Sequence, residues 1–257
     1  MPSSYEVFGR QKCRYDTCRP PLRLTGTTAC KWDTIIPFEP LWEQYKRIIK
    51  DNGAIVLTAS QPFTSALVMS NVNWFRHSWV WNKKKGGNFA QSNFQPLKIH
   101  EDILVFSKNK NRYFPQKKDA PIPSKRHLGK LGENTELRKE AGLNMKVKYS
   151  DTYEADKLMP VSILEISKDN YKSNSLHPTQ KPVALGRYLI RTYTNEGDLI
   201  LDNACGSGSF LVAAMLEKRK FVGIELDENY CAITRKRLED TQKDIDIKSS
   251  LYNADQN

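Results

Sequence analysis

Apolar positions recur with the periods of helices and strands at both ends of the chain, while the middle keeps no steady period. The first half predicts helices over residues 37–50 and 61–70 and strands over 54–59, 74–81 and 102–107, the last two flanking a loop at 83–87. The last third predicts strands over 161–166, 198–202 and 220–225 and helices over 182–193, 209–216 and 227–238. Alternating strands and helices are typical of an α/β domain with a largely parallel sheet.

The irregular middle predicts an insertion into this domain. Residues 109–159 contain Pro115, Pro121 and Pro123 and several lysines but no persistent apolar period. We therefore divide the chain into an atypical N-terminal segment (1–25), an α/β domain (26–108 and 160–240), an inserted lobe (109–159) and a polar tail (241–257). The tail is expected to fray.

Composition narrows the class of protein. The chain has 257 residues with a formal net charge of +11, and its five cysteines form no CxxC pair, which argues against a disulfide framework and against a metal site. No apolar run approaches the ~18 residues that a membrane span needs. We therefore expect a soluble, cytoplasmic protein without a membrane partner.

All of the excess charge lies in one segment. Residues 76–148 hold 17 Lys and Arg against 6 Asp and Glu, a net of +11 that equals the charge of the whole chain. Aromatic residues are interleaved with these bases, a pattern typical of surfaces that bind nucleic acid. The alternative is a solvated basic face with aromatic residues in the core. The expected DNA contacts are Arg76, Lys83, Lys84, Lys85, Lys117, Lys118, Lys125 and Arg126.

The strongest local signal is an apolar strand that ends in Asp202 and leads through Gly206-Ser207-Gly208 into a helix. Such a turn lets a ligand approach the backbone at the carboxyl edge of a parallel sheet, although an ordinary tight turn has the same pattern. The next strand ends in Glu225, about twenty residues later, where a ribose diol would be held. A helix cap is the alternative role for Glu225, but Asp227 is better placed to cap, which would leave Glu225 free.

Three motifs together resemble the amino-methyltransferases of DNA: His177-Pro178-Thr179-Gln180-Lys181-Pro182, the turn after Asp202, and Gly223-Ile224-Glu225. Their order is similar to the β-class enzymes of restriction-modification systems and phages. The resemblance implies a Rossmann-like methyltransferase fold, a mixed and mostly parallel sheet with an inserted basic lobe, and S-adenosylmethionine as cofactor. The cofactor residues that it implies are His177, Pro178, Thr179, Lys181, Pro182, Asp202, Cys205, Gly206, Gly208 and Glu225. Without it, His177 is a loop histidine and Lys181 a solvated or phosphate-facing lysine.

The chain departs from this family at the catalytic tetrapeptide, which in the family is an acid, amide or serine followed by Pro-Pro-aromatic. The matching position holds Leu22-Arg23-Leu24-Thr25, so the catalytic residues are unknown. Residues 1–19 are polar and basic, whereas a central parallel strand is usually a continuous apolar run. We therefore expect the central strand to be missing. A shifted reading frame or a mispredicted start upstream of Gly26 would account for the abrupt boundary.

The function indicated is transfer of a methyl group from S-adenosylmethionine to the exocyclic amine of adenine in double-stranded DNA. The missing tetrapeptide keeps two alternatives open: a non-catalytic remnant that binds DNA and cofactor, and a cytosine exocyclic-amine methyltransferase. An RNA methyltransferase on the same scaffold is a third. The resemblance also suggests a homodimer and a cognate restriction nuclease as partners.

Overall fold

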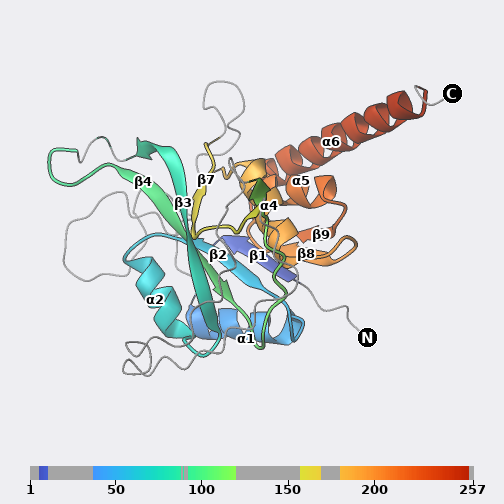
Figure 1. Ribbon diagram of the computed structural model, residues 1–257. Coiled ribbons are helices and arrows are strands. Elements are labelled where there is room, and N and C mark those ends of the chain that lie inside the picture. Colours follow the sequence, from blue (N-terminus) through green and yellow to red (C-terminus); the bar gives the residue numbers. More distant parts are fainter. Residues whose placement is uncertain are drawn as a thin grey trace, which may run out of the picture. The chain divides into compact units, whose positions relative to one another are not determined.

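The computed structural model describes residues 6–10, 37–87, 89, 92–119, 157–168 and 180–254, with the backbone alone at 6–10 and 252–254. The chain divides into two compact units, Met1–Phe114 with Ser162–Asn257, and Pro115–Val161 (Figure 1). The smaller unit contains the antiparallel pair β5 (Lys118–Asp119) and β6 (Lys157–Leu158). Most of the predicted lobe, including Lys125 and Arg126, lies outside the described residues.

The larger unit is built on a seven-stranded sheet in the order β7-β3-β4-β2-β1-β8-β9. These strands are β1 (Glu6–Arg10), β2 (Ile55–Ala59), β3 (Phe75–Gly87), β4 (Lys98–Phe106), β7 (Ile163–Glu165), β8 (Leu199–Asp202) and β9 (Lys220–Gly223). Both pairings of β4 are antiparallel and the other pairings in this sheet are parallel. The predicted mixed, mostly parallel sheet is confirmed.

Strand β1 corrects the expectation that the central strand is missing. It pairs in parallel with β2 on one side, Val7 opposite Ile55, and with β8 on the other, Val7 opposite Leu201. Sheet pairing joins backbone N–H and C=O groups, which every residue except proline provides. Five residues can therefore complete the centre of the sheet without a continuous apolar run. The tetrapeptide position Leu22–Thr25 lies outside the described residues.

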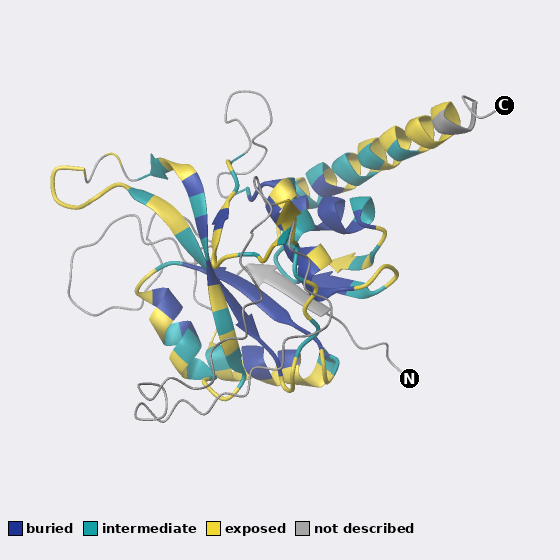
Figure 2. Ribbon diagram, in the orientation of Figure 1, coloured by how far each residue is buried: buried dark blue, intermediate teal, exposed yellow. Residues whose placement is uncertain are grey.

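The helices cover both faces of the sheet, as the alternation of side chains along each strand requires. They are α1 (Phe38–Ile48), α2 (Phe63–Ser70), α4 (Val183–Tyr193), α5 (Ser209–Leu216) and α6 (Glu228–Ala254). Ile55 and Leu57 of β2 pack with α1 and α2, whereas Val56 between them packs with α4 and α5. The strands between these layers are the most buried part of the sheet (Figure 2).

The predicted loop at 83–87 is wrong, because these residues continue β3. The strand pairs with β4 from Phe75 opposite Phe106 to Gly87 opposite Lys98, with an irregularity between Asn82 and Gly87. Lys84 lies there with a positive φ of 63°, and its N–H donates to the Asn82 side chain at 2.9 Å. The irregularity is a bulge in β3, and pairing with β4 resumes beyond it at Gly87.

The C-terminal tail is helical, not frayed as expected, because α6 continues to Ala254. It packs against α5 near its start and reaches past α5 toward its end (Figure 1). Side chains four residues apart support the exposed part: Lys236 pairs with Asp240 at 3.4 Å, and Gln242 donates to Asp246 at 2.8 Å. The polar composition of the tail predicts fraying, but the side-chain pairs along α6 support a helix there.

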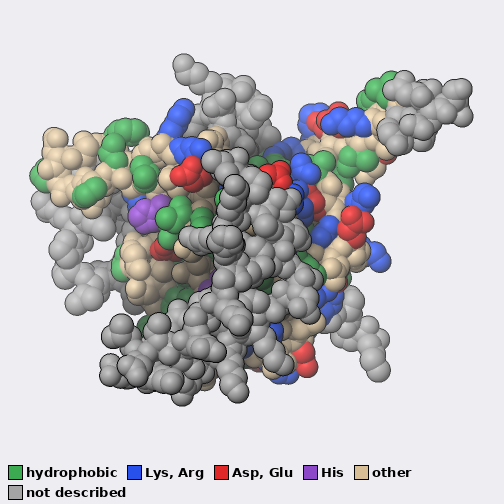
Figure 3. Space-filling view, in the orientation of Figure 1, with side chains coloured by type: hydrophobic (Ala, Val, Ile, Leu, Met, Phe, Trp, Pro, Cys, Tyr) green, Lys and Arg blue, Asp and Glu red, His purple; other side chains and the backbone are tan. Residues whose placement is uncertain are grey.

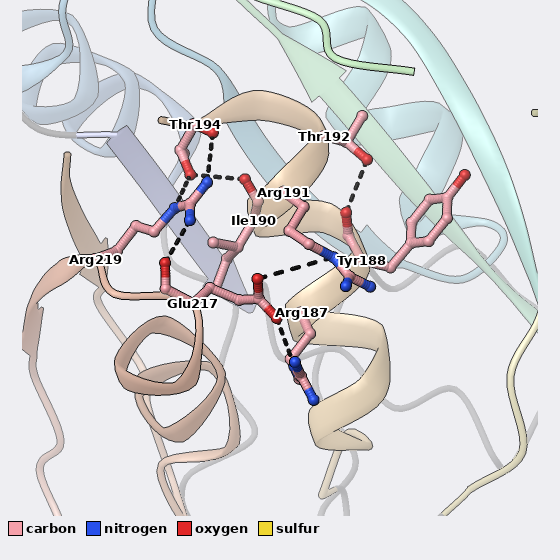
Figure 4. A network of polar contacts seen from close by, with 8 residues as sticks. All are labelled: Arg187, Tyr188, Ile190, Arg191, Thr192, Thr194, Glu217 and Arg219. Carbon is pink, nitrogen blue, oxygen red and sulfur yellow. Dashed lines mark hydrogen bonds and ion pairs between the residues drawn. The ribbon is translucent and has the colours of Figure 1, made fainter. Parts of the chain in front are cut away.

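A polar network joins α4 to α5 where both helices end (Figure 4). The Arg187 Nε donates to the Glu217 carboxylate at 2.5 Å. Arg219 donates to the Glu217 carbonyl and, through Nε and Nη2, to the Thr194 hydroxyl and carbonyl at 3.0 and 2.7 Å. These bonds satisfy carbonyl groups left unpaired at the helix ends, so the network closes this edge of the domain.

The aromatic cluster between β3 and α4 predicts a pH dependence of stability. His77 Nε2 lies 2.8 Å from the Tyr193 hydroxyl, which also accepts a bond from Trp79 Nε1 at 2.7 Å. Burial lowers the pKa of His77 below its ordinary 6.5. Unfolding therefore takes up a proton as the pH falls through about 6.5, so stability is full above that pH and declines below it.

Replacing His77 with Gln is expected to flatten this acid decline. The measurement is the urea midpoint of both chains between pH 7.5 and 5. The exposed His100 of β4 supplies the matched control His100→Gln, which should keep the wild-type slope. An unchanged slope in the His77 variant would show that another group causes the decline.

No helix among the described residues is long and apolar enough to cross a membrane. Within the same residues, no group of three or more His, Cys, Asp or Glu side chains is arranged to hold a metal ion.

Candidate functional site

The turn after β8 depends on glycines at defined positions. Gly206 and Gly208 have positive φ angles of 54° and 75°, a region that residues with a Cβ seldom adopt. A Cβ on Gly208 would lie 2.6 Å from Thr234 Cγ2, and Thr234 is itself fixed because its hydroxyl donates to the Gly206 carbonyl at 2.8 Å. The predicted Gly-x-Gly turn is therefore packed directly against α6, with bare backbone at both glycines.

Gly223, at the end of β9, is required by the close approach of α5. A Cβ there would lie 2.4 Å from Leu211 Cδ1 and 3.2 Å from Cys205 Sγ. The two strand ends are tied together, since Ile224 N–H donates to the Asp202 carbonyl and Cys205 N–H donates to the Ile224 carbonyl. The ends of β8 and β9 thus form one rigid rim at the carboxyl edge of the sheet.

Glu225 reaches across this rim to the glycine turn. Its Oε2 accepts a bond from Gly206 N–H at 2.7 Å, and its Oε1 accepts from Leu226 and Asp227 N–H at 3.0 and 3.2 Å. Asp227 caps α6 by accepting from Asn229 N–H at 2.8 Å. The expected cap is confirmed, but the expectation that Glu225 would be free is wrong, because backbone amides hold both of its oxygens.

Cys205 and Asp202 lie beneath the turn and are almost completely buried. Burial, together with the charges of Asp202 and Glu225, raises the pKa of the Cys205 thiol to about 12. A thiol reacts as its thiolate, so Cys205 is a packing residue and not a nucleophile. Asp202 Oδ1 accepts from Ala204 N–H at 3.3 Å, which shapes the first step of the turn.

The described end of the His177–Pro182 motif meets the same turn. The Ser207 hydroxyl donates to Gln180 Oε1 at 3.1 Å, and Pro182 directly precedes α4. His177, Pro178 and Thr179 lie outside the described residues. The structure therefore brings the turn, Glu225 and the end of this motif together.

Lys181 belongs to a buried charge cluster that the sequence did not reveal. Its Nζ lies 2.6 Å from Glu101 Oε2, while Lys83 Nζ lies 3.3 Å from Glu101 Oε1. Burial alone would raise the pKa of Glu101, but the two lysines outweigh it and hold that pKa at about 2. The Lys181 ammonium also lies over the Trp81 ring, 5.6 Å from its centroid. The one feature of the sequence that could have indicated this cluster is Glu101, an acidic residue within the basic segment 76–148.

Comparison with known proteins identifies the family. The sequence profile of the N6/N4 DNA methylase family matches residues 30–236, most of the chain. The chain belongs to this DNA methylase family. The chain is 26% identical over 196 residues to the DNA adenine methyltransferase YhdJ of Escherichia coli, a match that covers 75% of this chain and 63% of YhdJ. It spans less than two thirds of the length of several relatives.

Two solved structures have the same fold as this chain. The structure of M1.HpyAVI in complex with SAM gives a TM-score of 0.56 at 16% identity, covering 92% of this chain and 89% of that one. The cytosine-N4-specific PvuII DNA methyltransferase gives 0.54 at 15% identity, covering 91% and 78%. The expected methyltransferase fold is confirmed.

The structure separates the expected DNA contacts into those that bond to other groups of the fold and those whose side chains are exposed. Arg76 donates to the carbonyls of Ser107 and Lys108 at 2.7 Å each, and Lys83 is buried against Glu101. Both have partners within the fold, but only Lys83 is buried, whereas Arg76 is exposed. The exposed lysines are Lys84, Lys85, Lys117 and Lys118.

The aromatic residues of the basic segment also fall into two groups, one buried in the core and one exposed. Trp79 and Trp81 are core residues, as the alternative interpretation held, whereas Phe89 and Phe94 near the hairpin tip are 67% and 89% exposed. On the face drawn in Figure 3, described Lys and Arg side chains lie among Asp and Glu side chains. Among the described residues, three bases of the segment pair with acids outside it: Lys84 with Glu165, Lys108 with Asp51, and Arg112 with Asp198.

Proposed function

We propose that the chain transfers a methyl group from S-adenosylmethionine to the exocyclic amine of adenine in DNA. The observation that carries this proposal is the turn of Gly206 and Gly208 with Glu225 reaching across it, in a chain of the DNA methylase family. The adenine assignment is supported by the resemblance to β-class adenine enzymes and by the name of YhdJ.

The residues of the turn fit this cofactor. The positive φ angles of Gly206 and Gly208 bend the chain tightly after β8, and the Glu225 carboxylate lies 2.7 Å from the Gly206 nitrogen. Ribose hydroxyls lying over the turn would be within reach of this carboxylate, and would exchange with the backbone amides that it now accepts from. Bound S-adenosylmethionine supplies a methyl group already activated on sulfur.

The residues of this chain would bind the cofactor and orient its methyl group. Glu225 accepts hydrogen bonds from the sugar, and Gln180 and Ser207 hold the motif that precedes α4 against the turn. The strand ends that carry Glu225 and the turn are tied together by backbone hydrogen bonds, which favours a defined position for the methyl group once Glu225 has exchanged its partners. A base inside a stacked duplex cannot reach such a site, so the target base must be extruded from the helix.

Exposed lysines are the proposed phosphate contacts. Lys84 and Lys85 lie on β3 and Lys117 and Lys118 in the smaller unit, all exposed, and Lys125 and Arg126 remain proposals outside the described residues. Phosphate contacts give affinity and register but carry no sequence information. Weakened binding to all DNA sequences alike is therefore expected when these lysines are replaced.

Replacing Glu225 with Ala is expected to weaken cofactor binding about 10-fold to 100-fold, because hydrogen bonds to a charged group contribute about 1.5–3 kcal/mol. The measurement is calorimetric titration of the purified chain with S-adenosylmethionine. Glu228→Ala is the matched control, since Glu228 is an exposed acid in the first turn of α6. Equal affinities in the two variants would remove Glu225 from the proposed site.

A non-catalytic binding protein is the second candidate. It is favoured by Leu22-Arg23-Leu24-Thr25, which offers neither the acceptor nor the stacking ring that the family uses. Transfer of tritiated methyl from the cofactor to unmethylated DNA separates the two candidates. Transfer supports the enzyme, whereas cofactor and DNA binding without transfer supports the binding protein.

The target base is tested in the same assay. The name of the PvuII enzyme shows that this fold also serves cytosine N4, so cytosine is the alternative substrate. Digestion of the labelled DNA to nucleosides assigns the label to adenine or cytosine, and competition by RNA tests an RNA substrate. A homodimer and a cognate restriction nuclease are further proposals from the family resemblance, and the mass of the chain in solution tests the first.

A further inference from the structure

The charge cluster of Glu101, Lys83 and Lys181 lies at the edge of the sheet that carries the proposed cofactor turn. Because β4 runs against its neighbours, its first residues lie at the edge where β2, β8 and β9 end. Glu101 is near the start of β4, opposite Trp81 of β3. Lys181 arrives from a distant part of the chain, directly before α4.

Each oxygen of Glu101 has its own lysine. Lys181 pairs with Oε2 at 2.6 Å and Lys83 with Oε1 at 3.3 Å, and the exposed fractions of the three side chains are 10% for Lys181, 8% for Lys83 and 18% for Glu101. Without the carboxylate, two ammonium groups would face each other with little water to separate them. Removing one partner of a buried ion pair is strongly unfavourable for this reason, so Glu101 holds both lysines in place.

The two lysines are next in sequence to residues of two different surfaces. Lys181 follows Gln180, whose Oε1 accepts from the Ser207 hydroxyl in the glycine turn. Ser207 in turn accepts a bond from Arg237 of α6 at its carbonyl. Lys83 precedes Lys84 and Lys85, the exposed bases of the hairpin that we propose to face DNA. One carboxylate therefore connects the turn to the hairpin.

We infer that Glu101 is a positioning residue that couples the cofactor turn to the DNA-facing hairpin, so that occupancy of one site tightens binding at the other. This inference rests on the proposed function, because it needs both ligands. A contiguous set of contacts alone does not establish coupling, and a thermodynamic cycle measures it directly. The affinity for DNA is measured with and without S-adenosylhomocysteine, the product of the cofactor. The ratio of the two affinities measures the coupling between the two sites.

The experiment uses the full chain, S-adenosylhomocysteine and sheared unmethylated DNA. In the wild-type chain the nucleoside is expected to tighten DNA binding about 5-fold to 100-fold. Glu101→Gln keeps the size of the side chain and removes its charge, and its ratio is expected to fall below about twofold. The matched control is Glu165→Gln, since Glu165 also pairs with a hairpin lysine, Lys84 at 3.5 Å, but both of these side chains are at least half exposed.

The outcomes distinguish a positioning role from a structural one. A merely structural role of Glu101 would lower the melting temperature and the DNA affinities with and without S-adenosylhomocysteine, but would leave the ratio of these affinities unchanged. An unchanged ratio in a folded Glu101→Gln variant would therefore overturn the inference. If that variant does not fold, Lys83→Gln removes only the hairpin side of the cluster and must also lower the ratio. A wild-type ratio near one overturns the inference while the proposed function stands, whereas a wild-type chain that binds neither ligand overturns both.

Discussion

Replacing Gly208 with Ala is expected to lower the free energy of unfolding by about 2–4 kcal/mol. Gly208 has a φ of 75°, where a Cβ costs about 1–2 kcal/mol through its clash with the backbone. The same Cβ would lie 2.6 Å from Thr234 Cγ2, and Thr234 cannot move without losing its bond to the Gly206 carbonyl. Equilibrium urea unfolding of both chains measures the difference.

Gly197 supplies the matched control for this prediction. Its φ of 79° is nearly the same, but a Cβ there would meet nothing within 4 Å. Gly197→Ala should therefore show only the backbone cost of about 1–2 kcal/mol. If the two variants lose the same stability, the packing of the turn against α6 is looser than the structure shows.

Truncating Trp81 to Ala should cost about 3–5 kcal/mol, the usual range for a large aromatic residue in a core. The Trp81 side chain is completely buried between the sheet and α4, and its Nε1 donates to the Ile166 carbonyl at 2.8 Å. The substitution leaves a cavity, an unpaired carbonyl and a lysine without the ring over which it lies. Thermal and urea unfolding of the variant measure the loss.

The control for Trp81 lies in the same hairpin. Phe94 is 89% exposed, so Phe94→Ala should change stability by no more than about 0.5 kcal/mol. Comparable losses in the two variants would mean that Phe94 is covered in solution. A loss for Trp81 below that of Phe94 would contradict the division of the aromatic residues into core and surface.

The last third of the fold was predictable because local signals agree there. The predicted helix at 209–216 coincides with α5, and the predicted strand and glycine turn before it are present, since apolar period and turn chemistry favour the same structure. The rim formed by β8 and β9 follows from the same pattern. The candidate cofactor turn was therefore visible in the sequence.

Features that depend on contacts distant in sequence were not predictable. Lys83 was expected to contact DNA from a loop, but its partner Glu101 is 18 residues away and Lys181 is 80 residues from Glu101, so no local pattern indicates their meeting. β1 was missed because its sequence, Glu-Val-Phe-Gly-Arg, has only two apolar residues, too few to predict a buried strand. Glu225 was predicted to be free, and the amides that it accepts from are visible only in the folded turn.

The position of β1 has a consequence for aggregation. In the described sheet it joins one block of strands, β7-β3-β4-β2, to another, β8-β9. When these five residues detach, the facing edges of β2 and β8 expose rows of unpaired N–H and C=O groups, which can pair with the strands of other chains. The pairing of β1 with β2 and β8 forms only after strands far apart in the sequence meet, which is a slow step in folding. The integrity of the N-terminal strand therefore governs whether the chain remains monodisperse while it folds.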